Sequence, residues 1–254
     1  VHEGCDGEYE ILEKYKRGKS WRYKVRLIKS GYISENDSKD LYSGIIKDYT
    51  IPSVHGVGYM SHGDYPKSFL KDGKKVNHPC YETWIGILKR CYSGSCRGYE
   101  NYGGKGVTVC EDWLDYTKFY EWFMPKYKEG FCVDKDILSQ GYKGVTYSPD
   151  TCEIVPYCVN SFLTNSRRKR GLYPVGVYRK DTKSGKHRYI AQVGNLDDRQ
   201  DYLGRFDTMH EAFMAYKVAR EDLAKTLAER EYKAGNISEK IYNRLLEWEA
   251  VPYP

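Results

Sequence analysis

The sequence predicts an α+β protein built from several small modules. Short runs of alternating apolar and polar residues at 9–12 and 21–28 indicate strands, and apolar residues at helical spacing in 80–92 indicate a helix. The last third combines three further alternating runs with a long helical pattern. At 254 residues the chain is long enough for one large or two to three small domains. Because 26 residues of the apolar fraction are tyrosines, we expect modest cores rather than one large aliphatic core.

The composition argues against a membrane protein. No run approaches the roughly 18 consecutive apolar residues of a membrane-spanning helix, and no apolar segment typical of a signal peptide follows the N-terminus. We therefore expect a cytoplasmic protein whose eight cysteines are mainly buried thiols. A zinc site is less favoured because the chain has no CxxC pair, and disulfides are less favoured still.

Positive charge is concentrated in one part of the chain. The formal net charge is +6, whereas residues 160–189 alone contain nine basic residues and one acidic residue. A strongly basic stripe on an otherwise near-neutral protein is typical of polyanion binding. Four of these basic residues are consecutive and are expected to follow a nucleic-acid backbone: Arg167, Arg168, Lys169 and Arg170.

Residues 1–65 are predicted to form a β-rich N-terminal domain. The strands at 9–12 and 21–28 are followed by a turn at Ser30-Gly31, which fits a small meander. Residues 66–78 are expected to be an exposed linker. No motif in this part indicates a chemistry.

Residues 79–170 are predicted to form the central core. A helix over 80–92 places four apolar residues on one face: Trp84, Ile87, Leu88 and Cys91. Asp115 is expected to cap a second helix with the apolar face Phe119, Trp122 and Phe123. The segment 131–138 is expected to be an apolar strand that ends in acids. After a loop, a second strand leads into a helix that runs into the basic stretch.

Several motifs of this core are spaced over about 90 residues. They are W-x-x-x-L-x-R-C-Y at 84–92, Y-x-x-Y-G-G-K-G-V-x-V-C-x-x-W at 99–113, V-D-K-D at 133–136, Y-S-P-D-T-C at 147–152, and Asn160. With these motifs the segment resembles the HNH-type, or ββα-metal, proteins of bacteriophages. The resemblance implies a ββα core and a metal-dependent endonuclease site.

An active HNH site needs a histidine base, an Asn that orients it, and an acid and a helix residue that hold one divalent ion. By the resemblance, Asp134 stands at the place of the acid and Asn160 at that of the helix ligand, so both are candidate ligands of Mg²⁺. Lys135 stands in the place of the histidine. Asp136, which follows it, completes the candidate catalytic residues.

Lys135 would be a poor general base. With an ordinary pKa of about 10.4, its neutral form at pH 7 lies roughly 4–5 kcal/mol uphill. The flanking Asp134 and Asp136 favour the charged form further. A contact to phosphate or to the transition state suits Lys135 better. Three interpretations stay open: an active nuclease with an altered base, a retained ββα scaffold that grips DNA without cutting, and a charged turn that only orients the loop.

The last third is predicted to contain a domain over 171–234 and a helical extension over 235–254. Three strands follow one another from residue 176, and Thr208 and Glu211 form the capping box of a long helix. The buried stripe expected for this helix is Phe213, Tyr216, Ala219, Leu223 and Leu227. A final helix at 238–249 is expected to bury Ile241, Leu245 and Trp248.

Within this part a set of residues keeps a characteristic order and spacing over about 45 positions: Gly176-Val177, Tyr189, Ala191, Val193, Leu203-Gly204, Phe206, Thr208, Glu211-Ala212 and Ala215-Tyr216. In these residues the segment resembles the ethylene-response-factor (ERF) DNA-binding domain. That family lays a three-stranded sheet into the major groove while a helix braces the back of the sheet. The resemblance therefore implies double-stranded DNA as the partner.

An antiparallel sheet of this kind packs one face on the helix and leaves the other free. We expect Val177, Ile190 and Phe206 on the inner face. Because Arg reads guanine and Gln can read adenine, the residues expected to point outward are Arg179, Arg188 and Gln192. The residues expected near phosphates are Lys180, Lys183 and Lys186, with Tyr178 as a further candidate for DNA contact.

These observations together predict a duplex DNA-binding protein with an HNH-like core and an ERF-like module. One alternative is an active Mg²⁺-dependent nicking or homing endonuclease from a phage. A second is a phage protein that binds a host protein, which the abundant tyrosines would also fit. A basic hairpin without any partner is disfavoured because the charge excess and the sheet pattern coincide.

Overall fold

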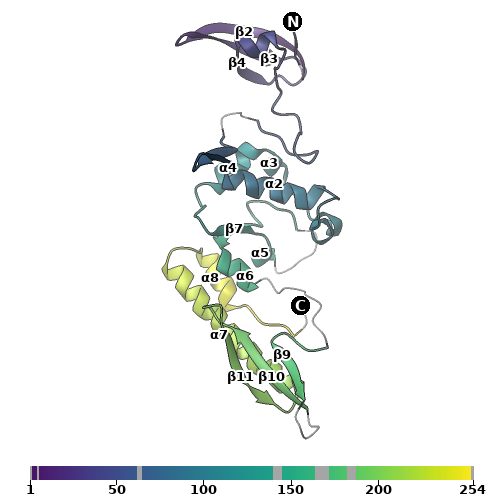
Figure 1. Cartoon of the computed structure of the whole chain (residues 1–254), viewed down its shortest axis with the longest axis vertical. Helices are drawn as coiled ribbons and strands as arrows, with labels where there is room; N and C mark the ends of the chain where they lie inside the picture. The colour runs from purple at the N-terminus through teal and green to yellow at the C-terminus, as the bar shows by residue number, and fades with distance from the viewer. Residues whose placement is uncertain are drawn as a thin grey trace. The chain divides into compact units, whose positions relative to one another are not determined.

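The computed structural model describes residues 2–4, 6–61, 65–139, 145–163, 172–181 and 187–252. Its fold is mixed α+β, which confirms the predicted class (Figure 1). The chain divides into two compact units, Val1–Lys126 with Lys143–Ser148, and Tyr127–Tyr142 with Pro149–Pro254. This division falls inside the predicted core of residues 79–170, so the HNH-like motifs are shared between the two units.

The N-terminal sheet is a four-stranded antiparallel meander. Its strands, in spatial order, are β1 (His2–Gly4), β2 (Gly7–Arg17), β3 (Ser20–Leu27) and β4 (Ile33–Asp37). The short helix α1 (Ser38–Tyr42) follows. A small core under this sheet consists of Tyr9, Val25, Leu27 and Ile46. Because β2 pairs Tyr9 with Leu27 and Arg17 with Ser20, this core lies at the end of the β2–β3 hairpin that is far from its turn.

The segment expected to be a linker forms a hairpin instead. Its strands β5 (Ser68–Lys71) and β6 (Lys74–Asn77) pair antiparallel. The two residues between them, Asp72 and Gly73, both have positive φ, of 51° and 73°. A two-residue Asp-Gly turn with this geometry matches the right-handed twist of a hairpin. The physical reason for the difference is therefore present in the sequence.

The helices of the first unit pack around buried tryptophans. α2 (Pro79–Tyr92) buries the predicted stripe Trp84, Ile87, Leu88 and Cys91, and His78 caps its N-terminus. The indole Nε1 of Trp84 donates to the carbonyl of Trp113 at 2.7 Å, which joins α2 to α3 (Glu111–Leu114). Asp115 caps α4 (Tyr116–Phe123), as predicted.

The Gly-rich motif between α2 and α3 has a packing role. It contains the 3₁₀ turns η1 (Tyr99–Asn101) and η2 (Gly103–Lys105). A Cβ at Gly103 would lie 2.0 Å from the carbonyl oxygen of Cys91, so only glycine allows this turn to approach α2. The guanidinium of Arg90 lies over the ring of Tyr102 at 5.2 Å. The motif at 99–113 thus stabilises the first unit.

The second unit begins with a hairpin followed by a helix. β7 (Phe131–Asp134) pairs antiparallel with β8 (Glu153–Pro156), and α6 (Tyr157–Leu163) contacts both strands. The expected strand over 131–138 was too long, since it ends at Asp134 and the helix α5 (Asp136–Ser139) follows. The reason is that the Asp134 side chain caps α5.

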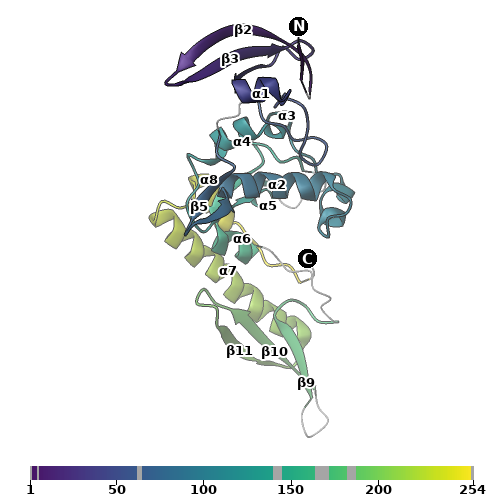
Figure 2. The same cartoon turned by 45° about the horizontal axis from the view of Figure 1, so that its top comes forward.

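The three predicted C-terminal strands form one antiparallel sheet in the order β11-β10-β9. Their bounds are β9 (Val177–Asp181), β10 (His187–Gly194) and β11 (Gln200–Phe206). The sheet packs on α7 (Met209–Lys233), which begins with the predicted capping box of Thr208 and Glu211. The last helix is α8 (Glu239–Leu246), which buries Ile241 and Leu245 as predicted. Figure 2 shows α7 running from the sheet towards α6 and α8.

α7 serves two cores in this unit. Its first half packs on the sheet through Phe213 and Tyr216, and its second half packs on α6 and α8 through Ala224 and Leu227. Arg220 lies between these halves, with its guanidinium 3.6 Å above the Phe162 ring and bonds to the carbonyls of Phe162 and Gly194. The β7–β8–α6 element and the sheet are therefore held on one 25-residue helix.

Among the described residues, no helix is both long enough and apolar enough to cross a membrane. The seven cysteines in the described ranges are free thiols, and Cys5 lies outside these ranges.

Candidate nucleic-acid interface

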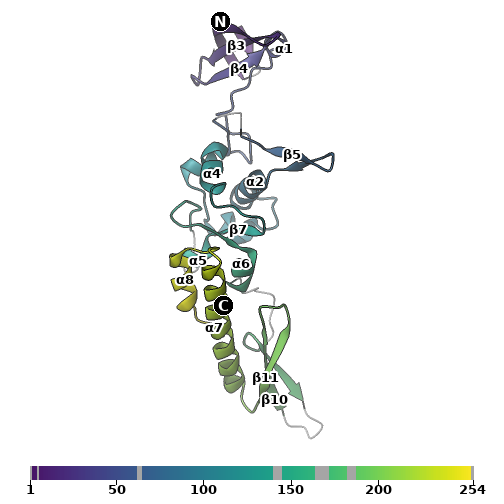
Figure 3. The same cartoon turned by 90° about the vertical axis from the view of Figure 1, so that its left-hand side faces the viewer.

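The β9–β11 sheet has two faces of different character. Val177, Ala191 and Val193 are buried with Phe213 and Tyr216 of α7. Side chains alternate along a strand, so the residues between these positions point away from α7. We call this side the outer face, and the strand register assigns to it Tyr178, Lys180, Arg188, Ile190, Gln192, Gln200, Tyr202 and Arg205. Figure 3 shows α7 along one side of this sheet only.

The outer face combines cations with aromatic and amide groups. Tyr178 and Tyr202 are 41% and 58% exposed, and Lys180 and Arg205 are also exposed. Ile190 is only 3% exposed and lies between Tyr178 and Arg205 in the register. The face therefore has an apolar centre surrounded by polar side chains.

Two expectations about this sheet were wrong. Ile190 was expected to face the helix but lies on the outer face, and Arg179 was expected to point outward but lies opposite Tyr189, which packs on the helix side. The physical reason is that α7 packs closely on Ala191, which is fully buried, so this small residue determines which side of β10 faces inward. Val177 and Phe206 pack on the inner side, as expected.

Carboxylates neutralise part of the positive charge. Asp181 accepts hydrogen bonds from Arg179 Nε at 2.9 Å and from His187 Nδ1 at 2.7 Å. The bond from Arg179, followed by that from His187, lowers the pKa of the Asp181 carboxyl. Arg188 forms an ion pair with Asp207.

Lys180 and Arg205 on the outer face differ from Arg179 and Arg188, which pair with carboxylates. Across the ranges that the structure describes, neither Lys180 nor Arg205 has a carboxylate partner. Both are exposed. Their charge is therefore available to an anion.

Six of the predicted DNA-binding residues lie outside the described residues. They are Arg167, Arg168, Lys169, Arg170, Lys183 and Lys186. Of the others, Tyr178, Lys180, Arg188 and Gln192 share the outer face. Sequence reasoning missed Gln200, Tyr202 and Arg205, because strict alternation in QDYLGRF places Tyr202 and Arg205 on opposite faces and only the irregular register with β10 brings them to the same one.

The candidate catalytic residues lie where β7 meets α5. Asp134 is 5% exposed, and its Oδ1 accepts backbone N–H bonds from Asp136 at 2.6 Å and from Ile137 at 2.9 Å. Burial raises the pKa of the Asp134 carboxyl, and the two backbone bonds oppose this rise. The carboxylate therefore has a structural role as the cap of α5.

The other candidates of this group have local partners. Lys135 forms an ion pair with Asp136, and its side chain is 11% exposed. Asn160 on α6 lies within hydrogen-bonding reach of the Cys132 thiol, whose pKa burial raises to about 11. The structure thus brings Asn160 to the β7 strand, while Lys135 is directed to its neighbour.

These residues fit a metal centre poorly. Within the described ranges, no three His, Cys, Asp or Glu side chains gather in a way that could hold a metal ion. The Oδ1 of Asp134 already accepts two hydrogen bonds. The residues present therefore do not support a chemical step through Mg²⁺.

The buried charge of Asp134 gives a test of its role. Asparagine keeps an oxygen that can accept both backbone bonds but has no charge, so Asp134→Asn is expected to melt a few degrees higher than the wild type at pH 7. The raised pKa means that the folded state holds the proton more tightly than the unfolded state does. The stability of the wild type therefore falls as the pH rises from the ordinary value of 3.8 through the raised value.

Below pH 3.8 the advantage of Asp134→Asn should disappear. Thermal melts from pH 3.5 to 7 measure the difference in melting temperature between the variant and the wild type. The matched control is Asp150→Asn, because Asp150 is an exposed aspartate of the same unit. The same response in both variants would contradict the assignment of a buried, charged cap.

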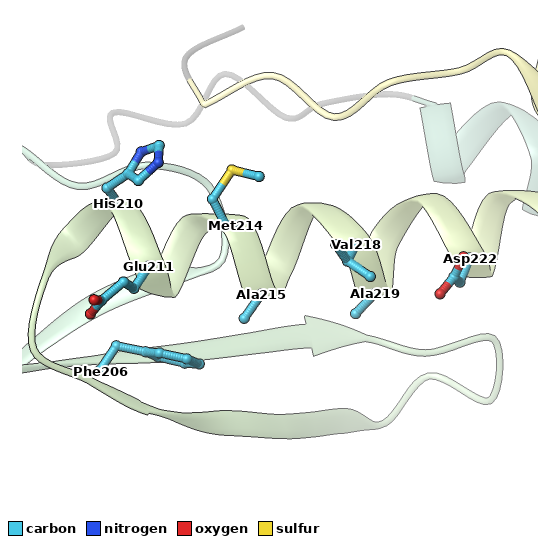
Figure 4. Close-up of a pocket in the computed structure, with 8 residues that line it drawn as sticks. All are labelled: Phe206, His210, Glu211, Met214, Ala215, Val218, Ala219 and Asp222. Carbon is cyan, nitrogen blue, oxygen red and sulfur yellow. The ribbon is translucent and has the colours of Figure 1, made fainter.

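An open apolar groove of about 670 Å³ lies along α7. Figure 4 shows that Phe206 comes from β11, whereas Met214 and Val218 come from α7. Of its two carboxylates, Glu211 is already engaged in the capping box with Thr208, and Asp222 forms an ion pair with Lys225. The groove therefore offers no set of groups that indicates catalysis.

Comparison of the chain with protein-family models, curated proteins and solved structures found no match. The fold and this site define an α+β protein with an exposed, cation-bearing sheet face that is braced by one long helix.

Proposed function

We propose that this chain binds duplex DNA through the outer face of the β9–β11 sheet. The observation that carries the proposal is the composition of this face, where Lys180, Arg188, Arg205 and Gln192 lie around Ile190 on the side that α7 leaves open. The major groove of DNA is about 12 Å wide and admits β-strands. A sheet supported by a helix on its back can therefore present these side chains to base edges.

The side chains have distinct roles in this proposal. Arg188 and Arg205 suit bidentate contacts to guanine, and Gln192 suits a contact to adenine. Lys180 suits a phosphate, as do the hydroxyl groups of the two exposed tyrosines. The ion pair with Asp207 holds Arg188 on the sheet before DNA arrives.

The basic stretch 167–170 adds backbone contacts to this proposal. Each neutralised phosphate contributes about −0.9 to the slope of log affinity against log salt concentration. Binding should therefore be steeply salt dependent. In this proposal the protein acts in the cytoplasm of a bacterial host cell, in keeping with the phage resemblance.

One gel tests binding and cleavage together. Supercoiled plasmid is incubated with the protein in Mg²⁺ and, separately, in EDTA, over a range of salt concentrations. We expect a shifted but intact plasmid in both lanes at low salt, with the shift lost as salt increases. No shift at low salt would contradict DNA binding and would leave a host-protein partner as the better proposal.

A second proposal is a metal-dependent nuclease. The observation that favours it is the β7–β8 hairpin with α6 packed on it, since this is the ββα arrangement that the HNH resemblance implies. Open-circle or linear plasmid only in the Mg²⁺ lane would support it, with Asp134 and Asn160 as the first residues to replace. The engaged oxygen of Asp134 and the ion pair of Lys135 make it the weaker proposal.

A further inference from the structure

The turn end of the β2–β3 hairpin is the second concentration of positive charge in the chain. Residues 14–24 contain six basic residues and no acidic residue. We call this segment the hairpin arm, since the core of its sheet lies at the other end of the two strands. It belongs to the N-terminal part, in which no motif indicates a chemistry.

The two faces of the hairpin arm differ in charge. On one face, Arg22 pairs in the register with Asp37, and Lys24 pairs with Glu35. The field of Arg22 is one of the influences that lower the pKa of Asp37, after a backbone hydrogen bond. This face therefore carries charges of both signs.

Within the described residues, the charged side chains of the opposite face are all cations. Lys14 pairs with Tyr23 and Lys16 with Trp21, so these four side chains share one face, which we call the Trp21 face. The ammonium groups of Lys14 and Lys16 lie 4.5 Å and 5.1 Å from the centroid of the Trp21 ring, and Lys14 also lies 5.5 Å from the Tyr23 ring. Trp21 is nevertheless 42% exposed.

This arrangement holds two like charges beside one another. Over the ranges that the structure describes, neither Lys14 nor Lys16 has a carboxylate partner. The negative face of the indole ring offsets part of their repulsion. Both ammonium groups keep their donors for an anion, and the ring contact reduces the freedom that the two side chains would lose on binding.

We propose that the Trp21 face of the hairpin arm is a second, sequence-independent binding site for the phosphate backbone of duplex DNA. Lys14 and Lys16 are two residues apart on one strand, which spaces them by about 6.8 Å. A row of cations without interspersed acids complements a partner that carries one negative charge per about 1.7 Å of its axis. A protein surface, which mixes both signs, is a poorer match. The proposal takes the identity of the polymer from the proposed function but depends on different residues.

The test compares two pairs of lysines in the N-terminal part of the chain. The double variant Lys14→Gln/Lys16→Gln removes the cations of the Trp21 face, and Lys24→Gln/Lys29→Gln removes two exposed lysines elsewhere. Fluorescence anisotropy with a random-sequence duplex of about 20 base pairs measures affinity against salt. We expect the first pair to lower affinity by about 10–50-fold near 0.1 M salt and to reduce the salt slope by about 1.8. The control pair should change the affinity by less than about threefold.

Trp21 provides a second measurement that does not depend on a substitution at the lysines. Trp84 and Trp113 are each 1% exposed, so iodide quenching of the wild type reports chiefly on more exposed rings such as Trp21. DNA should protect the wild type from iodide, and the Trp21→Phe variant should lose most of this protection. Equal affinities in the two lysine variants, or unchanged iodide quenching on adding DNA, would overturn the proposal. Binding to vesicles containing phosphatidylserine without binding to DNA would overturn it as well.

The experiments distinguish a wrong proposal for the hairpin arm from a wrong proposal for the outer face. If the arm proposal alone is wrong, the two lysine variants bind equally while outer-face variants lose affinity. If the outer-face proposal alone is wrong, Tyr202→Ala/Arg205→Ala binds as the wild type does, while the arm variant still weakens binding and DNA still protects Trp21.

Discussion

Replacing Tyr202 and Arg205 together by alanine is expected to weaken duplex DNA binding by about 100-fold. Both side chains are exposed on the outer face, and Arg205 has no carboxylate partner within the described residues. Loss of an arginine that contacts a base costs about 1–3 kcal/mol, and removal of an aromatic contact adds to it. A total of about 3 kcal/mol corresponds to roughly a 100-fold change. Anisotropy titrations against a selected duplex measure this loss.

A control variant distinguishes the loss of contacts on the outer face from the loss of overall positive charge. Lys225→Ala removes an exposed cation from α7, outside the β9–β11 sheet, where it pairs with Asp222. We expect it to change affinity by less than about threefold, while its salt slope falls little. If the control and the double variant lost affinity equally, nonspecific electrostatic attraction would explain binding and the outer face would have no special role.

Replacing Gly176 by alanine is expected to destabilise the second unit by about 2–5 kcal/mol. Gly176 has φ of +74°, and a Cβ there would lie 2.0 Å from Cδ2 of Tyr216. Two costs combine, since a left-handed backbone costs about 1–2 kcal/mol with a side chain and overpacking costs about 1–3 kcal/mol. The ring of Tyr216 is held in the core between the sheet and α7, so it cannot move aside cheaply. Calorimetry should show a melting transition lowered by about 10 °C or more.

Gly235→Ala is the control for this substitution. Gly235 belongs to the same unit and has φ of +66°, but nothing lies within 4 Å of a Cβ placed there. Only the backbone cost of about 1–2 kcal/mol should remain. Similar melting temperatures for the two variants would contradict the close contact between Gly176 and Tyr216.

Local sequence patterns were sufficient to predict most of the helices and strands. The apolar spacing of residues 80–92 and the capping residues Asp115 and Thr208 indicated α2, α4 and α7, and the structure confirms all three. These signals act over a few residues, so they can be read without knowledge of the fold. The hairpin at Asp72-Gly73 carried an equally local signal that was missed.

The candidate site was harder to predict because it depends on register. The basic residues of β9 and β10 were identified from the sequence, but the facing of Arg179 and Ile190 was not. A shift of one residue exchanges the two faces of a strand, and apolar character alone favoured the larger Ile190 over Ala191. The irregular pairing of β10 with β11 between Ala191 and Gln192 also hid the positions of Tyr202 and Arg205.

The sequence by itself determined the α+β class, the capped helices, the three-stranded C-terminal sheet and the excess of basic residues near it. Only the tertiary structure decided which of those basic residues share a face, that Asp134 is buried as a helix cap, and that Lys14 and Lys16 meet over Trp21. The physical reason is that secondary structure follows from interactions between neighbours in the chain. The charge and exposure of a surface, in contrast, follow from strand register and from packing between residues that are distant in sequence.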